Sequence, residues 1–368
     1  MRMMKRSSVC HVCVLFFLML FSLFVVGGAA QSTGVVAKEV NASQTVPAGN
    51  HTLPHTKENW SDLSLAGSDL ESRPPFVAQR DDQPQFTREL IQVQWREGDP
   101  IDLYVIVPKS AVKPPVILYL YSYPSETDRF RNNDYCDRVT RGGFAAVGFV
   151  SALTGHRYHN RPMKQWFVSE LREALVSSTH DVQMVLDYLS TRNDVDMDKV
   201  GMFGSGSGGT IAVLSASIDR RIKAIDLLDP WGDWPDWMAH SSIVPDEERP
   251  AYMKPEFLAD VATLDPVVVL PKLADRNVRM QLVIEDTSSP EAALKKLETA
   301  MPKNGVTLRY ATGKELFTSV SGGRLFDWIK DQFRAKTLPS DGMAAKQKTE
   351  GELSPNGKES KDTAFRSQ

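Results

Sequence analysis

Cysteine is scarce in this sequence, and the few cysteines present cannot cross-link a fold. Three occur among 368 residues, and two of them, Cys10 and Cys13, lie in the apolar stretch near the amino terminus. This leaves Cys136 without a second cysteine for an internal disulfide, so stability must come from a hydrophobic core. With 42% hydrophobic residues the chain can bury such a core.

A strong charge of either sign is also lacking. The formal net charge is −3, and no basic block is interleaved with aromatic residues. Neither nucleic acid nor an anionic membrane surface is therefore an expected partner. The sequence shows no metal-ligand spacing and no Walker phosphate-binding loop, so we expect no metal and no cofactor.

The one long hydrophobic run lies near the amino terminus. Three basic residues occur within the first six positions, residues 9–26 form a nearly unbroken apolar run, and residues 27–30 are small. This pattern predicts a signal peptide over residues 1–30, cleaved before Gln31, and a secreted or periplasmic product. The alternative is an uncleaved membrane anchor, because about 18 apolar residues approach the shortest membrane span.

Composition divides the rest of the chain into three parts. Residues 31–85 are rich in Ser, Thr, Asn, Asp and Pro, which predicts a flexible linker. Residues 337–368 are rich in Lys, Glu, Ser and Gly, which predicts a disordered tail. The folded domain is therefore expected over residues 86–336.

Strand and helix patterns alternate within this domain. Residues 86–107 predict a β-hairpin with its turn at Gly98-Asp99-Pro100. Helices are predicted at 166–189, 210–217, 291–300 and around 325–333, and short buried strands at 116–121, 144–150, 199–203, 222–228, 279–285 and 306–311. This order predicts a three-layer α/β fold with a mostly parallel central sheet.

A glycine-rich turn joins one predicted strand to the helix that follows it. It reads Gly204-Ser205-Gly206-Ser207-Gly208-Gly209, and it resembles the G-x-S-x-G nucleophile elbow of the α/β-hydrolase superfamily, in its dienelactone-hydrolase and prolyl-oligopeptidase-like branch. Ser122 and Tyr123 follow an apolar strand, where that family places its oxyanion loop. The resemblance implies an α/β-hydrolase fold with backbone donors near these residues.

The catalytic positions of the family are not matched. Aligned without a gap, the elbow places Gly206 at the nucleophile position, and the acid position holds Ser289. No histidine follows His240, and the family's histidine position falls near Lys314 and Glu315. A serine mechanism needs a base that takes and returns a proton. We therefore expect a catalytically impaired protein that retains a pocket for a small-molecule ligand.

An active enzyme is the first alternative. Shifted by one residue, the elbow offers Ser207 as nucleophile, with His156 or His159 as base and Asp229 as acid. This set would give a serine hydrolase acting on an ester or peptide substrate.

A second alternative comes from another class of protein. Gly204-x-Gly206-x-x-Gly209 also matches the dinucleotide-binding fingerprint, with Asp226 further along the chain as the ribose-binding acid. Against it, the motif lies in the middle of the chain, after several predicted strands.

Tryptophan is concentrated just after the strand at 222–228. Trp231, Trp234 and Trp237 lie within seven residues, where the resemblance implies a cap insertion over the pocket. The rings are suited to stacking on a ligand or to holding the cap against the body of the domain.

Overall fold

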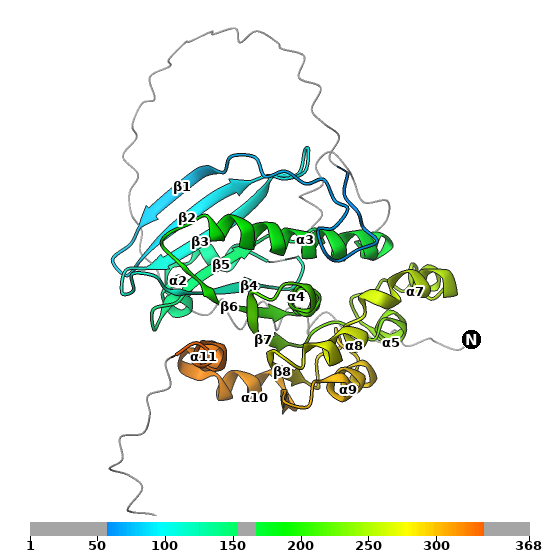
Figure 1. Ribbon diagram of the computed structural model, residues 1–368. Coiled ribbons are helices and arrows are strands. Elements are labelled where there is room, and N and C mark those ends of the chain that lie inside the picture. The colour runs from blue at the N-terminus through cyan, green and yellow to red at the C-terminus, as the bar shows by residue number, and fades with distance from the viewer. Residues whose placement is uncertain (1–56, 125, 154–166, 335–368) are drawn as a thin grey trace, which may run out of the picture. The chain divides into compact units, whose positions relative to one another are not determined.

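The apolar segments of the chain pair into a nine-stranded sheet of order β1-β2-β3-β5-β4-β6-β7-β8-β9 (Figure 1). The computed structural model describes residues 57–124, 126–153 and 167–334. The strands are β1 (Phe76–Asp82), β2 (Phe86–Val93), β3 (Ile101–Pro108), β4 (Pro115–Leu120), β5 (Ala145–Phe149), β6 (Asp196–Ser205), β7 (Ile222–Leu228), β8 (Asn277–Val283) and β9 (Val306–Tyr310).

The sheet is parallel from β5 to β9 and antiparallel at its amino-terminal end. β4 pairs in parallel with β5 and β6, and β6, β7, β8 and β9 continue in parallel. β1, β2 and β3 pair in antiparallel fashion, and β3 joins β5 in the same way. The predicted mostly parallel α/β sheet and its hairpin are confirmed.

Helices cover both faces of the sheet, which explains the nearly continuous apolar runs of the central strands. They are α2 (Asn133–Thr140), α3 (Leu171–Ser190), α4 (Ser207–Ile218), α5 (Trp234–His240), α6 (Arg249–Tyr252), α7 (Pro255–Val261), α8 (Pro266–Val269), α9 (Glu291–Ala300), α10 (Gly313–Ser319) and α11 (Asp327–Asp331). The short 3-10 helices are η1 (Asp128–Arg131), η3 (Phe167–Glu170), η4 (Ala262–Leu264), η5 (Leu270–Leu273) and η6 (Ser321–Phe326).

Two hydrophobic cores lie on the two sides of the sheet. One core contains the apolar residues of α3 and α4, and the other contains those of α2 together with Ile329 of α11. Cys136 of α2 is fully buried in the second core, and its thiol donates to the carbonyl oxygen of Phe130 at 3.1 Å. The molecule therefore has the three layers that the sequence predicts.

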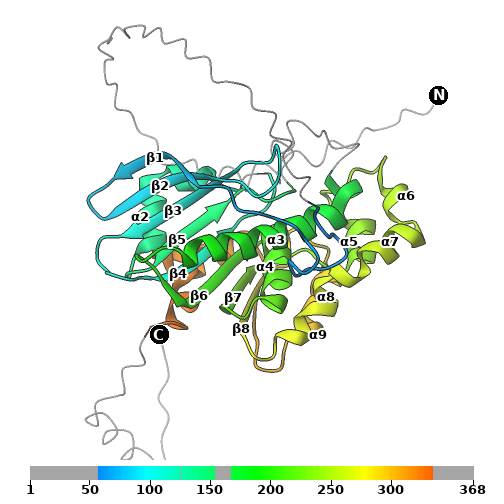
Figure 2. The same ribbon diagram turned by 45° about the horizontal axis from the view of Figure 1, so that its top comes forward.

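The flexible linker predicted over residues 31–85 is too long. Residues 76–82 form β1, which pairs with β2 at the edge of the sheet. Residues 57–70, called the strap here, pack against α3 (Figure 2). The composition concealed both elements, because every residue of β1 is exposed or half-buried and the strap is anchored mainly by polar contacts.

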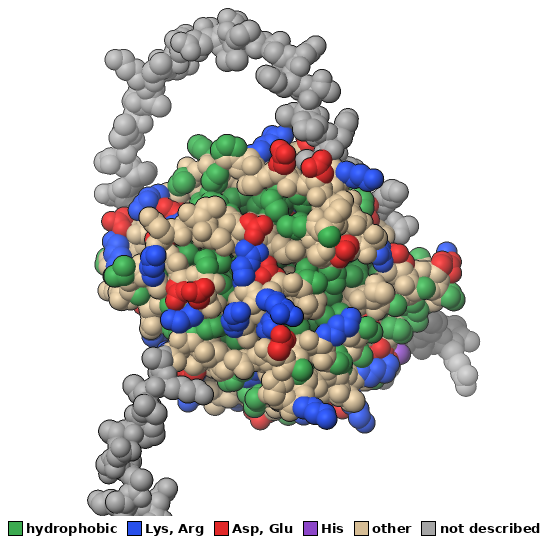
Figure 3. Space-filling view, in the orientation of Figure 1, with side chains coloured by type: hydrophobic (Ala, Val, Ile, Leu, Met, Phe, Trp, Pro, Cys, Tyr) green, Lys and Arg blue, Asp and Glu red, His purple; other side chains and the backbone are tan. Residues whose placement is uncertain are grey.

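Several predictions concern parts of the chain outside the described residues. The signal peptide, residues 31–56, the tail from residue 335 onward, His156 and His159 all lie there. Within the described ranges, no helix combines the length and apolar character needed to cross a membrane. On the face shown in Figure 3, acidic and basic side chains are interspersed and form no patch of one sign.

Candidate functional site

The glycine-rich elbow lies where the sequence predicts it. β6 ends at Ser205, Gly206 adopts φ +54° and ψ −120°, and α4 begins at Ser207. β6 lies inside the sheet, with the parallel strands β4 and β7 on its two sides. Positive φ favours glycine, and a sharp turn of this kind points its apex residue away from the sheet.

The space beside the apex is already filled. A Cβ atom added to Gly206 would lie 2.4 Å from Ser122 Oγ, 2.8 Å from Ser122 Cβ and 3.2 Å from Trp231 Nε1. Carbon and oxygen atoms that are not bonded do not approach this closely. The position that carries the nucleophile in the related enzymes therefore has no side chain and no room for one.

Ser207 lies at the first position of α4 and is engaged by the backbone. Its side chain is buried, and Oγ accepts a hydrogen bond from the backbone N–H of Tyr123 at 2.9 Å. Tyr123 was predicted to offer this N–H to a ligand or an oxyanion, but the donor is directed at Ser207 instead. The structure thus brings the two predicted residues together in a contact within the protein.

Asp229 is buried and held by the neighbouring strand. Its Oδ1 accepts a hydrogen bond from the N–H of Val283 at 2.7 Å. Burial, reinforced by the charge of Asp286, raises the pKa of Asp229 well above its usual range despite that hydrogen bond. A carboxyl group that favours its neutral form is poorly suited to stabilise a charged histidine.

The position expected for the family's histidine serves as the start of a helix. Thr312 Oγ1 accepts from the N–H of Glu315 at 3.1 Å, and Glu315 Oε2 accepts from the N–H of Ala311 at 2.7 Å. The first bond makes Thr312 the N-cap of α10, and the second ties the Glu315 side chain back to the residue before that cap. Ser289, at the acid position, is buried and donates to the Asp229 carbonyl oxygen at 3.4 Å.

The two histidines in the described part of the chain bond elsewhere. His180 Nδ1 lies 2.7 Å from Glu58 Oε1, and His240 Nδ1 lies 3.1 Å from Asp236 Oδ1. His156 and His159, the bases proposed for an active enzyme, lie outside the described residues.

The glycines of the elbow are required by close packing of protein backbone. A Cβ at Gly204 would lie 2.5 Å from the carbonyl oxygen of Gly208, and a Cβ at Gly208 would lie 2.1 Å from that of Leu120.

Asp226, the predicted ribose ligand, is fully buried and forms two hydrogen bonds with Arg279, at 2.8 and 2.6 Å. These contacts explain the fingerprint-like spacing without a dinucleotide.

Of the two roles considered for the three clustered tryptophans, their burial favours holding the cap against the body of the domain over stacking on a ligand. The ring centroids of Trp231 and Trp237 are 4.9 Å apart, those of Trp234 and Trp237 are 5.8 Å apart, and Trp231 stacks on Phe167 at 5.9 Å. The rings hold α5 against the body of the domain. Asp265 supports them by accepting from the N–H groups of Asp233 and Trp234, both at 2.8 Å.

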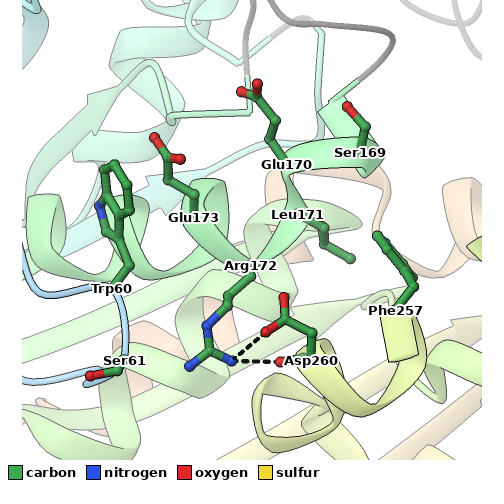
Figure 4. A pocket seen from close by; sticks show the side chains of 9 residues that line it. All are labelled: Trp60, Ser61, Ser169, Glu170, Leu171, Arg172, Glu173, Phe257 and Asp260. Carbon is green, nitrogen blue, oxygen red and sulfur yellow. Dashed lines mark hydrogen bonds and ion pairs between the residues drawn. The ribbon is translucent and has the colours of Figure 1, made fainter. Parts of the chain in front are cut away.

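A pocket lies away from the elbow, between the strap, the start of α3 and α7 (Figure 4). Its volume is about 640 Å³. Arg172 forms part of its wall and donates to the Asp260 carbonyl oxygen at 2.5 Å. The lining residues are Trp60, Ser61, Ser169, Glu170, Leu171, Arg172, Glu173, Phe257 and Asp260. Sequence patterns did not indicate this pocket, because Trp60 and Ser61 lie in the segment predicted as a linker. Within the described residues, no group of three or more His, Cys, Asp or Glu side chains is arranged to hold a metal ion.

Comparison with known proteins places the fold in a defined class. The structure resembles acetyl xylan esterase 1 from Thermoanaerobacterium sp. JW/SL YS485, with TM-score 0.55 and 14% identity, over 70% of this chain and 89% of the esterase. It resembles the acetyl xylan esterase from Paenibacillus sp. R4 with TM-score 0.55 and 15% identity, over 71% and 89% of the two chains. At these identities the likeness concerns the fold, which is that of an α/β-hydrolase.

The family follows from the sequence match. The family model described as X-Pro dipeptidyl-peptidase (S15 family) matches residues 97–310. This is more than half of the chain, which therefore belongs to this family of α/β-hydrolase-type proteins. A curated Bacillus subtilis (strain 168) protein, "Putative hydrolase YtaP", is 26% identical over 140 residues, covering 34% of this chain and 46% of that protein. The chain thus matches less than half the length of this relative.

Proposed function

We propose that this chain is an exported α/β-hydrolase-fold protein that binds a small molecule and is catalytically impaired at its elbow. The observation that carries the proposal is the filled apex, where a Cβ on Gly206 would lie 2.4 Å from Ser122 Oγ. Export is supported by the predicted signal peptide over residues 1–30.

The chemistry of the site supports impairment at each step of a serine mechanism. Acyl transfer needs a nucleophile, a base that accepts its proton, and donors that stabilise the oxyanion. Gly206 supplies no nucleophile, the Tyr123 N–H bonds Ser207, and Glu315 caps a helix where the family would place histidine. One substitution would not restore such a set.

A binding role is supported by the pocket beside α3. Its volume of about 640 Å³ lies within the ~300–1,000 Å³ typical of small-molecule sites. Trp60 and Phe257 contribute aromatic surface, and charged side chains contribute polar surface (Figure 4). Binding at this pocket requires no proton transfer, so it does not depend on the elbow.

The first prediction concerns hydrolysis. The purified mature protein is expected to show no measurable turnover of activated short-chain esters and no labelling by a fluorophosphonate probe, because no side chain at the elbow is free to attack. Ser207→Ala should leave both results unchanged. An active homologue that retains a complete triad serves as the positive control for the reagents.

Turnover that Ser207→Ala abolishes would overturn the proposal in favour of an active esterase or peptidase-like enzyme. His156→Ala and His159→Ala would then identify its base. Turnover that survives Ser207→Ala would contradict both mechanisms.

Dinucleotide binding is tested in parallel by titration with NAD and NADP, for which no saturable binding is expected because Arg279 engages Asp226.

A further inference from the structure

Two aromatic side chains border the pocket beside α3, and they come from different elements. Trp60 belongs to the strap and remains 36% exposed. Phe257 belongs to α7 and is half-buried. Figure 4 shows the two rings on opposite sides of the start of α3. A ligand that contacts both rings must therefore extend across the pocket.

The ring of Phe257 is supported from behind by the protein. It packs against Tyr252 of α6, with ring centroids 5.2 Å apart, and Tyr252 is itself buried. An aromatic ring held in this way offers a ligand a fixed apolar surface.

Most of the remaining wall is polar. Six of the nine described lining residues carry polar or charged side chains, and three of these are the carboxylates of Glu170, Glu173 and Asp260. Arg172 Nη1 donates to the Asp260 carbonyl oxygen and lies 3.4 Å from Asp260 Oδ1. These two contacts join α3 to α7 at the wall of the pocket.

Such a wall is poorly matched to two classes of ligand. A wholly apolar ligand would remove the carboxylates from water without giving them a hydrogen bond, which is costly. The oxygens of an anionic ligand accept hydrogen bonds, as carboxylates do, so they would meet these side chains with no proton between them. The favoured ligand therefore combines an apolar face with hydrogen-bond donors.

A saccharide has both properties. The C–H face of a sugar ring is apolar and can stack on an aromatic ring, while the hydroxyl groups at the ring edge donate to carboxylates and accept from a guanidinium group. A carboxylate has about four acceptor positions, so it can accept from a hydroxyl group in addition to the contacts that it makes within the protein. Because the ligand is neutral, this match does not depend on the net charge of the wall.

We propose that the pocket beside α3 binds a neutral oligosaccharide. One sugar ring stacks on Trp60, a second contacts Phe257, and the carboxylates of the wall accept from the hydroxyl groups (Figure 4). The inference rests on the proposed binding role of this pocket and names its ligand class. It does not depend on whether the elbow is active.

Isothermal titration calorimetry of the purified protein tests the ligand class. The probes are linear tetrasaccharides of β-1,4-linked glucose, xylose or mannose, together with free glucose. We expect saturable binding of at least one tetrasaccharide. Free glucose should bind weaker than that tetrasaccharide by about tenfold or more, because a single ring reaches only one of the two aromatic side chains.

Variants of Trp60 test where the saccharide binds. Trp60→Ala should weaken tetrasaccharide binding by about tenfold or more, and Trp60→Tyr should restore most of the affinity, because it returns an aromatic ring. The matched control is Phe317→Ala. Phe317 is an exposed aromatic residue of α10 outside the pocket lining, so its removal should leave the affinity unchanged. Equal affinity of the wild type and Trp60→Ala would overturn the proposal.

A further titration separates failure of the ligand class from failure of the binding role. Choline carries a cation that aromatic rings and carboxylates can both attract. If choline binds in a way that Trp60→Ala abolishes, and no saccharide binds, then the saccharide assignment is wrong and the binding role stands. If neither the saccharides, nor choline, nor any compound of a thermal-shift screen shows saturable binding that depends on Trp60, then both the assignment and the proposed binding role are wrong.

Discussion

Gly206 and Ser122 show how closely the apex of the strand-to-helix turn is packed in this fold. The backbone at Gly206 has the positive φ of a sharp strand-to-helix turn, and β6 and α4 meet there as the family resemblance implies. The hydroxymethyl group of Ser122 fills the volume into which a nucleophile would project. The turn of the family is thus present, and its apex residue is a glycine packed against Ser122.

This packing predicts a large stability cost for Gly206→Ala. The substitution combines about 1 kcal/mol of strain at positive φ with the cost of overpacking, about 1–3 kcal/mol. Gly98→Ala is the control, because Gly98 has φ +68° in the exposed turn between β2 and β3 and should cost only the strain. The double variant Gly206→Ala/Ser122→Gly should recover part of the loss. Urea unfolding measures all four proteins, and equal costs for the two single glycine variants would contradict the filled apex.

At the scale of elements, the sequence predicted most of the strands and helices whose side chains follow an apolar pattern. β7 and α9 have the predicted bounds, Ile222–Leu228 and Glu291–Ala300, because burial imposes the period of each element on its side chains. β1 was missed because its residues FVAQRDD are exposed or half-buried along the whole strand. The strap was missed because Glu58 pairs with groups distant in sequence, Arg96 and His180.

The same limit applies to the candidate site. The elbow was located correctly, because Gly204–Gly209 lies between an apolar strand and a helix. What fills its apex was not predictable, since Ser122 and Trp231 arrive from other loops. The burial of the tryptophans likewise depends on partners such as Phe167, which lies well before them in the chain.

The start of α10 provides a prediction at this scale. Thr312→Ala removes the acceptor for the Glu315 N–H and should destabilise the protein by about 1 kcal/mol. Thr318→Ala on the same helix is the control, because the Thr318 hydroxyl only bonds back to the Lys314 carbonyl oxygen and should cost little. Thermal unfolding of both variants makes the comparison. A Thr312→Ala protein as stable as Thr318→Ala would argue against a capping role for Thr312.

For the whole molecule, Lys330 joins α11 to the α2 region, which lies far away in sequence. Its Nζ donates to the carbonyl oxygens of Arg138 at 3.1 Å and Arg141 at 2.8 Å. The side chain is almost fully buried. Burial lowers the pKa of Lys330 from its ordinary value of 10.5 to about 8.

This pKa predicts a pH dependence of global stability with a definite sign. Between about pH 8 and pH 10.5 the unfolded chain holds a proton on Lys330 that the folded chain has released. Folding is therefore increasingly favoured as the pH rises through this window, by up to about 3 kcal/mol from this group. Lys330→Met removes the contribution, so the stability of wild type relative to this variant should increase from pH 7 to pH 10. Lys296 is the contrasting control, because its hydrogen bond with Asp233 raises the pKa of Lys296 from its ordinary value of 10.5. The difference between wild type and Lys296→Met should therefore stay nearly constant from pH 7 to pH 10 and fall only above about pH 10.5. Differential scanning calorimetry of the three proteins at several pH values measures how the stability of wild type relative to each variant changes with pH. A wild-type advantage over Lys330→Met that shrinks as the pH rises would show that Lys330 stays charged in the folded protein.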